Sequence, residues 1–131
     1  MTEQREKVRL VALAKIDLEA LKEGKTLLKN ISITGCCLLC PISTNIELNT
    51  KYGLEITPEG SAEIDLFDLL AESRWIRACA GFFEIGFFIL ESPKGDQFLR
   101  YVDYLSWRCS QGIGVTGESY VKILPLVNAG D

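Results

Sequence analysis

The sequence contains no histidine. Without an imidazole, the chain cannot form a Ser-His-Asp or Cys-His nucleophile arrangement, and it lacks the ligand that most zinc sites use. It also has no apolar run long enough to span a membrane as a helix, so we expect no membrane protein. The 14 Lys and Arg residues are outnumbered by 18 Asp and Glu, for a net charge of -4. Such a chain has no overall basic field to follow a nucleic-acid backbone, and we expect no DNA or RNA partner.

The cysteines are five, an odd number that does not complete a disulfide framework. The first residues are polar rather than signal-like, and both features favour a reducing, cytoplasmic setting. Cys37 and Cys40 form a CxxC pair. On a strand, however, these two side chains point to opposite faces, and neither a histidine nor a second pair completes four ligands. We therefore expect no metal site and interpret these cysteines as small hydrophobic residues.

Other chemical motifs are weak. Residues 112–117 spell GxGxxG, but they follow a predicted helix rather than a strand, which argues against a dinucleotide-binding fold. Glu63 and Asp65 share one face of a predicted strand without a partner base, so a solvated sheet face is favoured over acid-base chemistry. Without a catalytic constellation, we expect no enzyme and no cofactor. An aromatic group with strand-like alternation is interpreted as core packing: Trp75, Phe82, Phe83, Phe87 and Phe88.

Length and periodicity predict the fold. A chain of 131 residues with 47% hydrophobic content forms one core. Alternating apolar residues separated by turn residues predict short strands at 10–17, 26–31, 36–40, 45–48, 54–57, 62–70, 74–83 and 86–90. Apolar residues at helical spacing between Asp96 and Cys109 predict one helix near the C-terminus. The pattern is typical of a mainly β protein, an antiparallel barrel or sandwich with a C-terminal helix.

The charge is unevenly distributed along the chain. Residues 52–73 contain six carboxylates and neither Lys nor Arg, so the rest of the chain is net positive. Residues 1–9, interpreted as a flexible N-terminal arm, contain Arg5, Lys7 and Arg9. These residues form a local positive charge that can bind a small anion. Residues 110–131 are interpreted as a C-terminal tail, whose apolar stretch at 120–127 has no role that the pattern reveals.

Two segments suggest a specific chemistry. Arg5 and Arg9 form an RxxxR pair, and a guanidinium matches both a phosphate and the O6 and N7 edge of guanine. On an extended arm, four steps of about 3.3 Å let the two arginines straddle a dinucleotide. Asn30, Ser32 and Gly35 form NxSxxG at the predicted end of a strand. The first two side chains point the same way and can bond a ligand, and glycine allows close approach to the backbone.

In the order and spacing of its RxxxR and NxSxxG motifs, the chain resembles the PilZ family over about residues 5–109. The Arg74-Trp75-Ile76 strand, the stretch from Glu84 to Phe88 and the helix containing Phe98 are similar to the family's later landmarks. The resemblance implies a six-stranded antiparallel β-barrel with a closing C-terminal α-helix over residues 10–109.

The resemblance also implies a ligand, the bacterial second messenger cyclic di-GMP. By resemblance, Arg5 and Arg9 bind phosphate and guanine, Asn30 and Ser32 bond the ligand, and Gly35 shapes the loop. The implied protein is a small receptor or adaptor, monomer or homodimer, whose surface for an unidentified effector protein changes on ligand binding, in motility or biofilm formation. The alternative is a nucleotide-independent adaptor of the motility or type IV pilus machinery that uses the barrel face or residues 120–127. Dependence of partner binding on the nucleotide separates the two.

Overall fold

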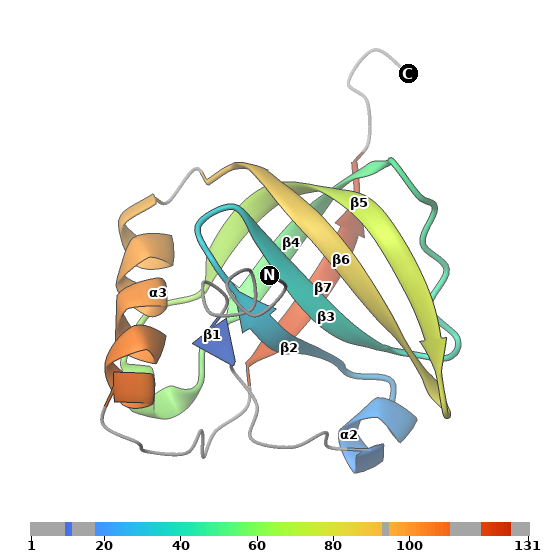
Figure 1. Ribbon diagram of the computed structural model, residues 1–131, viewed down its shortest axis with the longest axis horizontal. Coiled ribbons are helices and arrows are strands. Elements are labelled where there is room, and N and C mark those ends of the chain that lie inside the picture. The colour runs from blue at the N-terminus through green and yellow to red at the C-terminus, as the bar shows by residue number, and fades with distance from the viewer. Residues whose placement is uncertain (1–9, 12–17, 93–94, 111–118, 127–131) are drawn as a thin grey trace, which may run out of the picture.

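The computed structural model describes residues 10–11, 18–92, 95–110 and 119–126 (Figure 1). Its elements in chain order are β1 (Leu10–Val11), α2 (Leu18–Lys22), β2 (Thr26–Ile31), β3 (Gly35–Pro41), β4 (Lys51–Thr57), the 3-10 helix η1 (Gly60–Ala62), β5 (Phe67–Cys79), β6 (Phe82–Glu91), α3 (Gly95–Ser110) and β7 (Tyr120–Pro125). Arg5, Arg9 and the GxGxxG segment lie outside the described residues.

The strands form one antiparallel sheet that closes on itself. Neighbouring strands follow the order β1-β2-β3-β6-β5-β4-β7, and β7 also pairs with β2. This second pairing closes a barrel of six strands, while β1 lies outside the ring along β2. The fold is therefore mainly β, a closed six-stranded antiparallel barrel with a helix near the C-terminus, as the sequence predicts.

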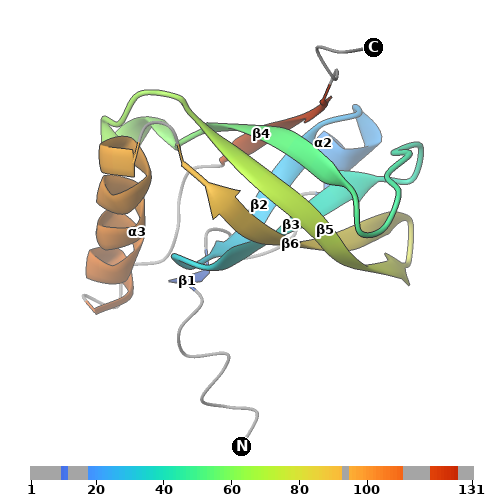
Figure 2. The ribbon, with the colours of Figure 1, turned by 90° about the horizontal axis from the view of Figure 1, so that it is seen from above.

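The barrel interior follows from side-chain alternation. On β4, Tyr52, Leu54 and Ile56 are buried while the residues between them are not. They join one large cluster that α3 completes with Phe98, Tyr101 and Leu105. Figures 1 and 2 show α3 standing at one end of the barrel. Burying each large apolar side chain contributes about 1.5–3 kcal/mol, so the cluster fixes α3 against the barrel.

A second, smaller cluster lies on the outer surface of the barrel. The short helix α2 places Ala20 and Leu21 against Leu27, Leu39 and Phe82 of three neighbouring strands. On β3, this cover accounts for the burial of Leu39. Residues 18–22 are thus helical because Ala20 and Leu21 have an apolar surface to cover.

The strand boundaries differ from the prediction in several places. The predicted strand at 45–48 is a loop, and β5 at Phe67–Cys79 spans parts of the two strands predicted at 62–70 and 74–83. The strand β6 begins at Phe82, inside the second of these, rather than at Gly86. Of the predicted strand at 10–17, only Leu10–Val11 lie among the described residues.

The polar residue Ser73 does not interrupt β5, because its buried hydroxyl accepts a hydrogen bond from the Thr50 N–H (3.2 Å) and donates one to the Glu47 carbonyl. These bonds hold the 45–50 loop against β5, although the loop does not pair with β5 as a strand.

The barrel also extends beyond residue 109, into the segment interpreted as a tail. Tyr120–Pro125 is the strand β7, which pairs with β4 and β2 and completes the ring. Ser119, just before it, is fully buried, bonds the hydroxyl of Tyr101 on α3, and accepts a hydrogen bond from the Leu28 N–H (3.0 Å). Among the described residues, no helix is both long and apolar enough to cross a membrane.

Candidate functional site

The NxSxxG segment forms the hairpin connection between β2 and β3. The Ser32 N–H donates to the Gly35 carbonyl (2.8 Å), and the Ser32 hydroxyl oxygen accepts from the N–H groups of Thr34 and Gly35 (3.3 Å each). Ser32 is 5% exposed. Its hydroxyl therefore stabilises the turn itself, and Ser32 and Gly35 together form the frame of the hairpin.

The hairpin is also fixed to a neighbouring strand. The Ile89 N–H donates to the Thr34 carbonyl (2.9 Å), and Gly35 pairs with Phe88 on β6. The connection between β2 and β3 thus has a defined position on the outer surface of the barrel. Backbone hydrogen bonds within the hairpin and to β6 therefore fix the position of its residues.

Asn30 precedes this hairpin, and the oxygen of its side-chain amide lacks a hydrogen bond. Its Oδ1 atom is buried and has no hydrogen-bond partner. Leaving a buried acceptor unpaired costs about 1–3 kcal/mol. A ligand that offers an N–H group, as the Watson–Crick edge of guanine does, would recover this free energy.

The chain after Arg9 enters the described fold beside Asn30. Leu10 pairs with Ile31, and Val11 pairs with Asn30. The pairing of β1 with β2 therefore brings the end of the arm sequence next to the end of the NxSxxG strand, although about twenty residues separate them. The structure leaves Arg5 and Arg9 themselves undescribed.

Asn30 begins a line of four residues that we call the cross-strand row: Asn30, Cys37, Gly86 and Trp75. Each is opposite the next, on β2, β3, β6 and β5 in turn. Directly opposed residues of antiparallel strands share a face of the sheet, so the row runs across one face. Three strand spacings of about 4.8 Å separate the backbones at its two ends.

The two middle residues of the row, Cys37 and Gly86, are small, and the indole of Trp75 lies over Gly86. A Cβ atom added to Gly86 would lie 2.2 Å from Trp75 Cε2 and Nε1, so the indole lies directly on the glycine backbone. Trp75 nevertheless remains 39% exposed. One side of the ring is thus supported by β6, and the exposed side is a surface on which another flat ring can stack.

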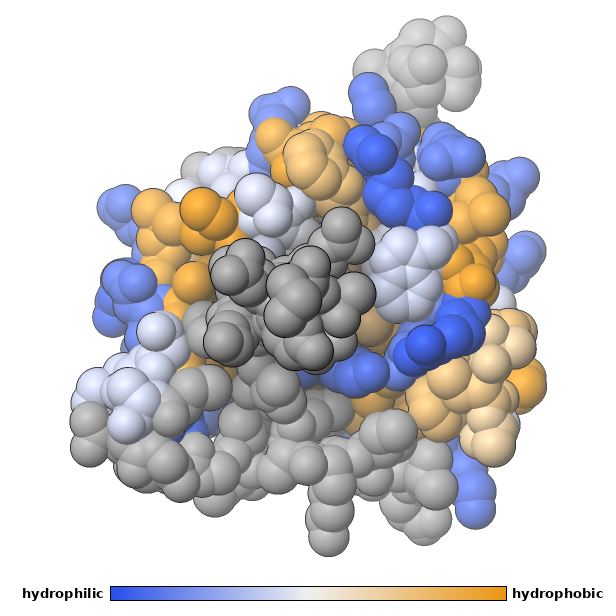
Figure 3. Space-filling model, in the orientation of Figure 1, coloured by the Kyte–Doolittle hydropathy of each residue, from blue (hydrophilic) through white to orange (hydrophobic). Residues whose placement is uncertain are grey.

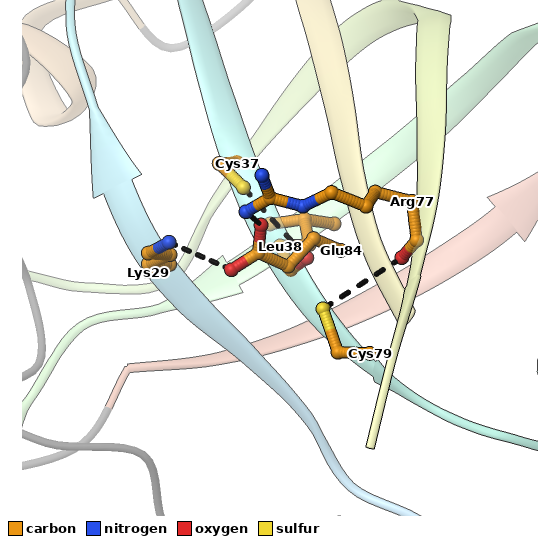
Figure 4. Close-up of polar contacts among 6 residues, drawn as sticks. All are labelled: Lys29, Cys37, Leu38, Arg77, Cys79 and Glu84. Atoms are coloured by element: carbon orange, nitrogen blue, oxygen red, sulfur yellow. Dashed lines mark hydrogen bonds and ion pairs between the residues drawn. The ribbon is translucent and has the colours of Figure 1, made fainter. Parts of the chain in front are cut away.

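Charged side chains flank the row on one side (Figure 4). Glu84 on β6 is 3% exposed and lies between Lys29 of β2 and Arg77 of β5. Lys29 Nζ is 2.7 Å from Glu84 Oε2, and the Arg77 guanidinium donates to Glu84 Oε1. Burial alone would raise the pKa of Glu84, but hydrogen bonds and charges from Lys29 and Arg77 outweigh it and hold the pKa below its usual value. This cluster carries one net positive charge.

An aromatic side chain and a third cation flank the other side. Phe88, opposite Gly35, is 41% exposed, and the guanidinium carbon of Arg74 lies 4.9 Å from its ring centroid. Figure 3 shows hydrophobic and hydrophilic side chains interspersed over this side of the molecule. The surface around the row therefore offers both ring faces and cations, which is what a nucleotide requires.

The core-packing prediction for the aromatic residues is therefore wrong for Trp75 and Phe88. It holds for Phe87, which is 2% exposed inside the barrel, and Phe82 is 6% exposed under α2. Strand alternation alone indicated that these residues face two sides, but not which side is covered. The sequence reasoning also missed Lys29, Arg77 and Glu84, because only strand pairing brings them together.

The structure also shows the environment of the cysteines and of the acidic pair Glu63 and Asp65. Cys36 and Cys40 belong to the main core cluster, whereas Cys37 lies on the cross-strand row. Burial, followed by the nearby Cys37, raises the pKa of Cys40 to about 12. Glu63 and Asp65 are exposed and precede β5. Among the described residues, no three His, Cys, Asp or Glu side chains are grouped to hold a metal ion.

A separate groove of about 610 Å³ lies along β7. It opens where β7 extends past β2: β7 pairs with β2 at Val121 and Tyr120, but pairs with β4 along its whole length. Lys25, Lys122, Glu55 and the loop at 44–46 line it. Leu124 and Leu126, at the end of β7, are 40% and 50% exposed.

The fold and the site define a small antiparallel barrel that presents an exposed indole and paired cations on one outer face, beside the buried, unpartnered Oδ1 of Asn30. Comparison of the chain with protein-family models, curated proteins and solved structures finds no match.

Proposed function

We propose that this chain binds cyclic di-GMP and acts as a receptor or adaptor rather than as an enzyme. The observation that carries the proposal is the cross-strand row. It combines an exposed indole over Gly86 with the buried, unpartnered Oδ1 of Asn30. A guanine base has a flat face for the first and N–H donors for the second.

The arm supplies the anion contacts in this proposal. The sequence places Arg5 and Arg9 directly before β1, and β1 pairs with β2 at Asn30. Two guanidinium groups at that end of the row can bind the phosphates and the O6 and N7 edge of guanine. Ser32 and Gly35 contribute by fixing the hairpin that positions Asn30, and this role replaces the direct contact that the resemblance to the PilZ family implies for Ser32.

In the proposed mechanism, ligand binding alters the outer face of β2, β3, β6 and β5. A dinucleotide lying on the row would cover exposed aromatic surface and orient the arm across it. Both changes create a surface that an effector protein can distinguish from the free one, and differential affinity of that protein for the two states provides the signal. We infer that this surface is the output of the receptor.

A nucleotide-independent adaptor is the second candidate, and the groove along β7 favours it. The free edge of β7 beyond β2, together with exposed Leu124 and Leu126, offers backbone and apolar contacts to a partner chain. In this alternative the partner binds equally well with and without cyclic di-GMP.

Calorimetric titration with cyclic di-GMP, beside GTP, tests the proposal. We expect saturable binding of cyclic di-GMP at micromolar or lower concentration and none with GTP. The Arg5→Ala, Arg9→Ala double variant should lose binding, and Trp75→Ala should weaken it about fivefold or more, because stacking of a base contributes about 1–3 kcal/mol.

The matched control is Trp107→Ala. Trp107 is 52% exposed on α3 but lies away from the row, so its loss should leave the affinity unchanged. Absence of heat and of thermal stabilisation at saturating cyclic di-GMP would reject the proposal in favour of the adaptor. Equal affinity in the wild-type chain and the Trp75→Ala variant would place the ligand elsewhere.

A further inference from the structure

We propose that Lys29 and Arg77, held by Glu84, form a phosphate-binding site for the nucleotide that lies on the cross-strand row. The inference rests on the proposed function and adds a second anion site to the arginines of the arm. Glu84 acts as a positioning residue, and Lys29 and Arg77 are the groups that touch the ligand.

The charge balance of the cluster leaves cationic donors available. Glu84 is the only carboxylate within ion-pair distance of Lys29 or Arg77 among the described residues. A lysine has three N–H donors and an arginine five, and Glu84 engages one hydrogen bond from each. The remaining donors face outwards, since the side chains of Lys29 and Arg77 are 37% and 65% exposed.

The location of the two cations matches the row. Lys29 precedes Asn30 on β2 and therefore flanks one end. Arg77 is two residues after Trp75 on the same face of β5 and flanks the other, because side chains two apart on a strand point the same way. A nucleotide's phosphate is joined to its base through a single sugar. A base stacked on the indole therefore places its phosphate within reach of these long side chains.

The buried carboxylate explains why two like charges can lie so close on the surface. Lys29 and Arg77 would repel each other without Glu84 between them. Their ion pairs with Glu84 also restrict their rotamers before the ligand arrives, which lowers the entropy cost of binding. An isolated surface ion pair needs one cation, and the second cation here leaves the cluster with a net positive charge beside the row.

Binding measured at several salt concentrations tests the site. Lys29→Met and Arg77→Met should each weaken cyclic di-GMP binding about tenfold, as expected for a lost charge-assisted hydrogen bond. Each should also reduce the dependence of the affinity on salt, because one cation fewer faces the phosphates. Arg77→Lys, which keeps the charge, should recover part of the affinity.

Lys122→Met is the matched control. It removes the same charge from β7, on a different part of the barrel, and should change neither the affinity nor its salt dependence. Thermal melting of each variant verifies folding. Since the side chains of Lys29 and Arg77 are 37% and 65% exposed, we expect both Met variants to fold. Glu84→Gln removes the negative charge between the two cations and should therefore make the salt dependence steeper.

The outcomes separate this inference from the function on which it rests. If the wild-type chain binds cyclic di-GMP and the Lys29 and Arg77 variants bind equally tightly with unchanged salt dependence, the phosphate site is wrong and the receptor proposal stands. If the wild-type chain does not bind cyclic di-GMP, both are wrong. Weakened binding in the two Met variants but not in Lys122→Met supports the phosphate site.

Discussion

At the scale of single residues, the proposed site depends on one position that has no side chain. Gly86 lies in the middle of β6 with an ordinary strand partner on each side, Cys37 and Trp75. Its role is steric rather than conformational: the indole of Trp75 occupies the volume that any Cβ would need. Because a ring in contact with the backbone is fixed on one side, the exposed side is presented in a single orientation.

Gly86→Ala should therefore displace the indole. The added methyl would lie 2.2 Å from ring atoms, and overpacking of this kind costs about 1–3 kcal/mol. We expect a lower free energy of unfolding in urea, a shift in tryptophan emission and weaker binding of cyclic di-GMP.

Gly60→Ala is the control for Gly86→Ala. A Cβ at Gly60 would meet no atom within 4 Å, and the residue lies in η1, away from the row. We expect its unfolding free energy to stay close to that of the wild-type chain. Equal stability and equal emission in the Gly86→Ala variant would show that the indole does not rest on this glycine.

At the scale of elements, the β2–β3 hairpin separates positioning from contact. Ser32 is buried and its hydroxyl bonds the backbone of the turn, so the Asn30 amide is the group left to meet a ligand. Ser32→Ala should lower the free energy of unfolding by about 1–3 kcal/mol, because the N–H groups of Thr34 and Gly35 lose their acceptor. Asn30→Ala should instead relieve an unpaired acceptor and leave stability nearly unchanged while weakening binding.

Urea denaturation and calorimetric titration of both variants test this division. Ser43→Ala, which removes an exposed hydroxyl from the loop after β3, serves as the control and should change neither quantity. A Ser32→Ala variant that is as stable as wild type but fails to bind the nucleotide would contradict the positioning role and restore Ser32 as a direct contact.

The hairpin also shows how far sequence reasoning reached. Asn30, Ser32 and Gly35 were found because turn chemistry is local: their spacing indicates a strand end and a tight connection within six residues. Trp75, Arg77 and Glu84 could not be found this way. Their relation to Asn30 depends on three non-local pairings, β2 with β3, β3 with β6 and β6 with β5, and on bulges that reset the register near Leu28 and Ser73.

At the scale of the whole molecule, the six-stranded barrel was predicted, but the strand that closes it was assigned to the C-terminal tail. Alternating apolar residues indicated many antiparallel strands, and the helix had a clear period. The strand β7 follows α3 in the chain and ends at Pro125, and its short apolar pattern does not by itself indicate a barrel strand. It becomes a barrel strand because Ser119 is buried against Tyr101 of α3 and Leu28 of β2, contacts between residues far apart in the sequence.

The core that results should make the protein sensitive to alkaline pH. Burial, together with the nearby Cys37, raises the pKa of Cys40 from 9.0 to about 12, and burial raises that of Tyr101 from 10.0 to about 12. The unfolded chain therefore releases these protons at a lower pH than the folded chain does. The contribution of Cys40 is complete below pH 9 and that of Tyr101 below pH 10, and both are lost as the pH rises from these values to about 12.

Urea denaturation at several pH values measures the effect. Up to about pH 12, the free energy of unfolding should fall by up to about 1.4 kcal/mol per pH unit for each group, from pH 9 for Cys40 and from pH 10 for Tyr101. Cys40→Ser removes one of the two contributions, because a serine hydroxyl does not ionise in this range, and the decline above pH 9 should become shallower by about one group's share. An identical slope in the wild-type and Cys40→Ser chains would mean that the Cys40 thiol ionises as readily in the folded barrel as in the unfolded chain, and that the barrel interior at β3 is open to water.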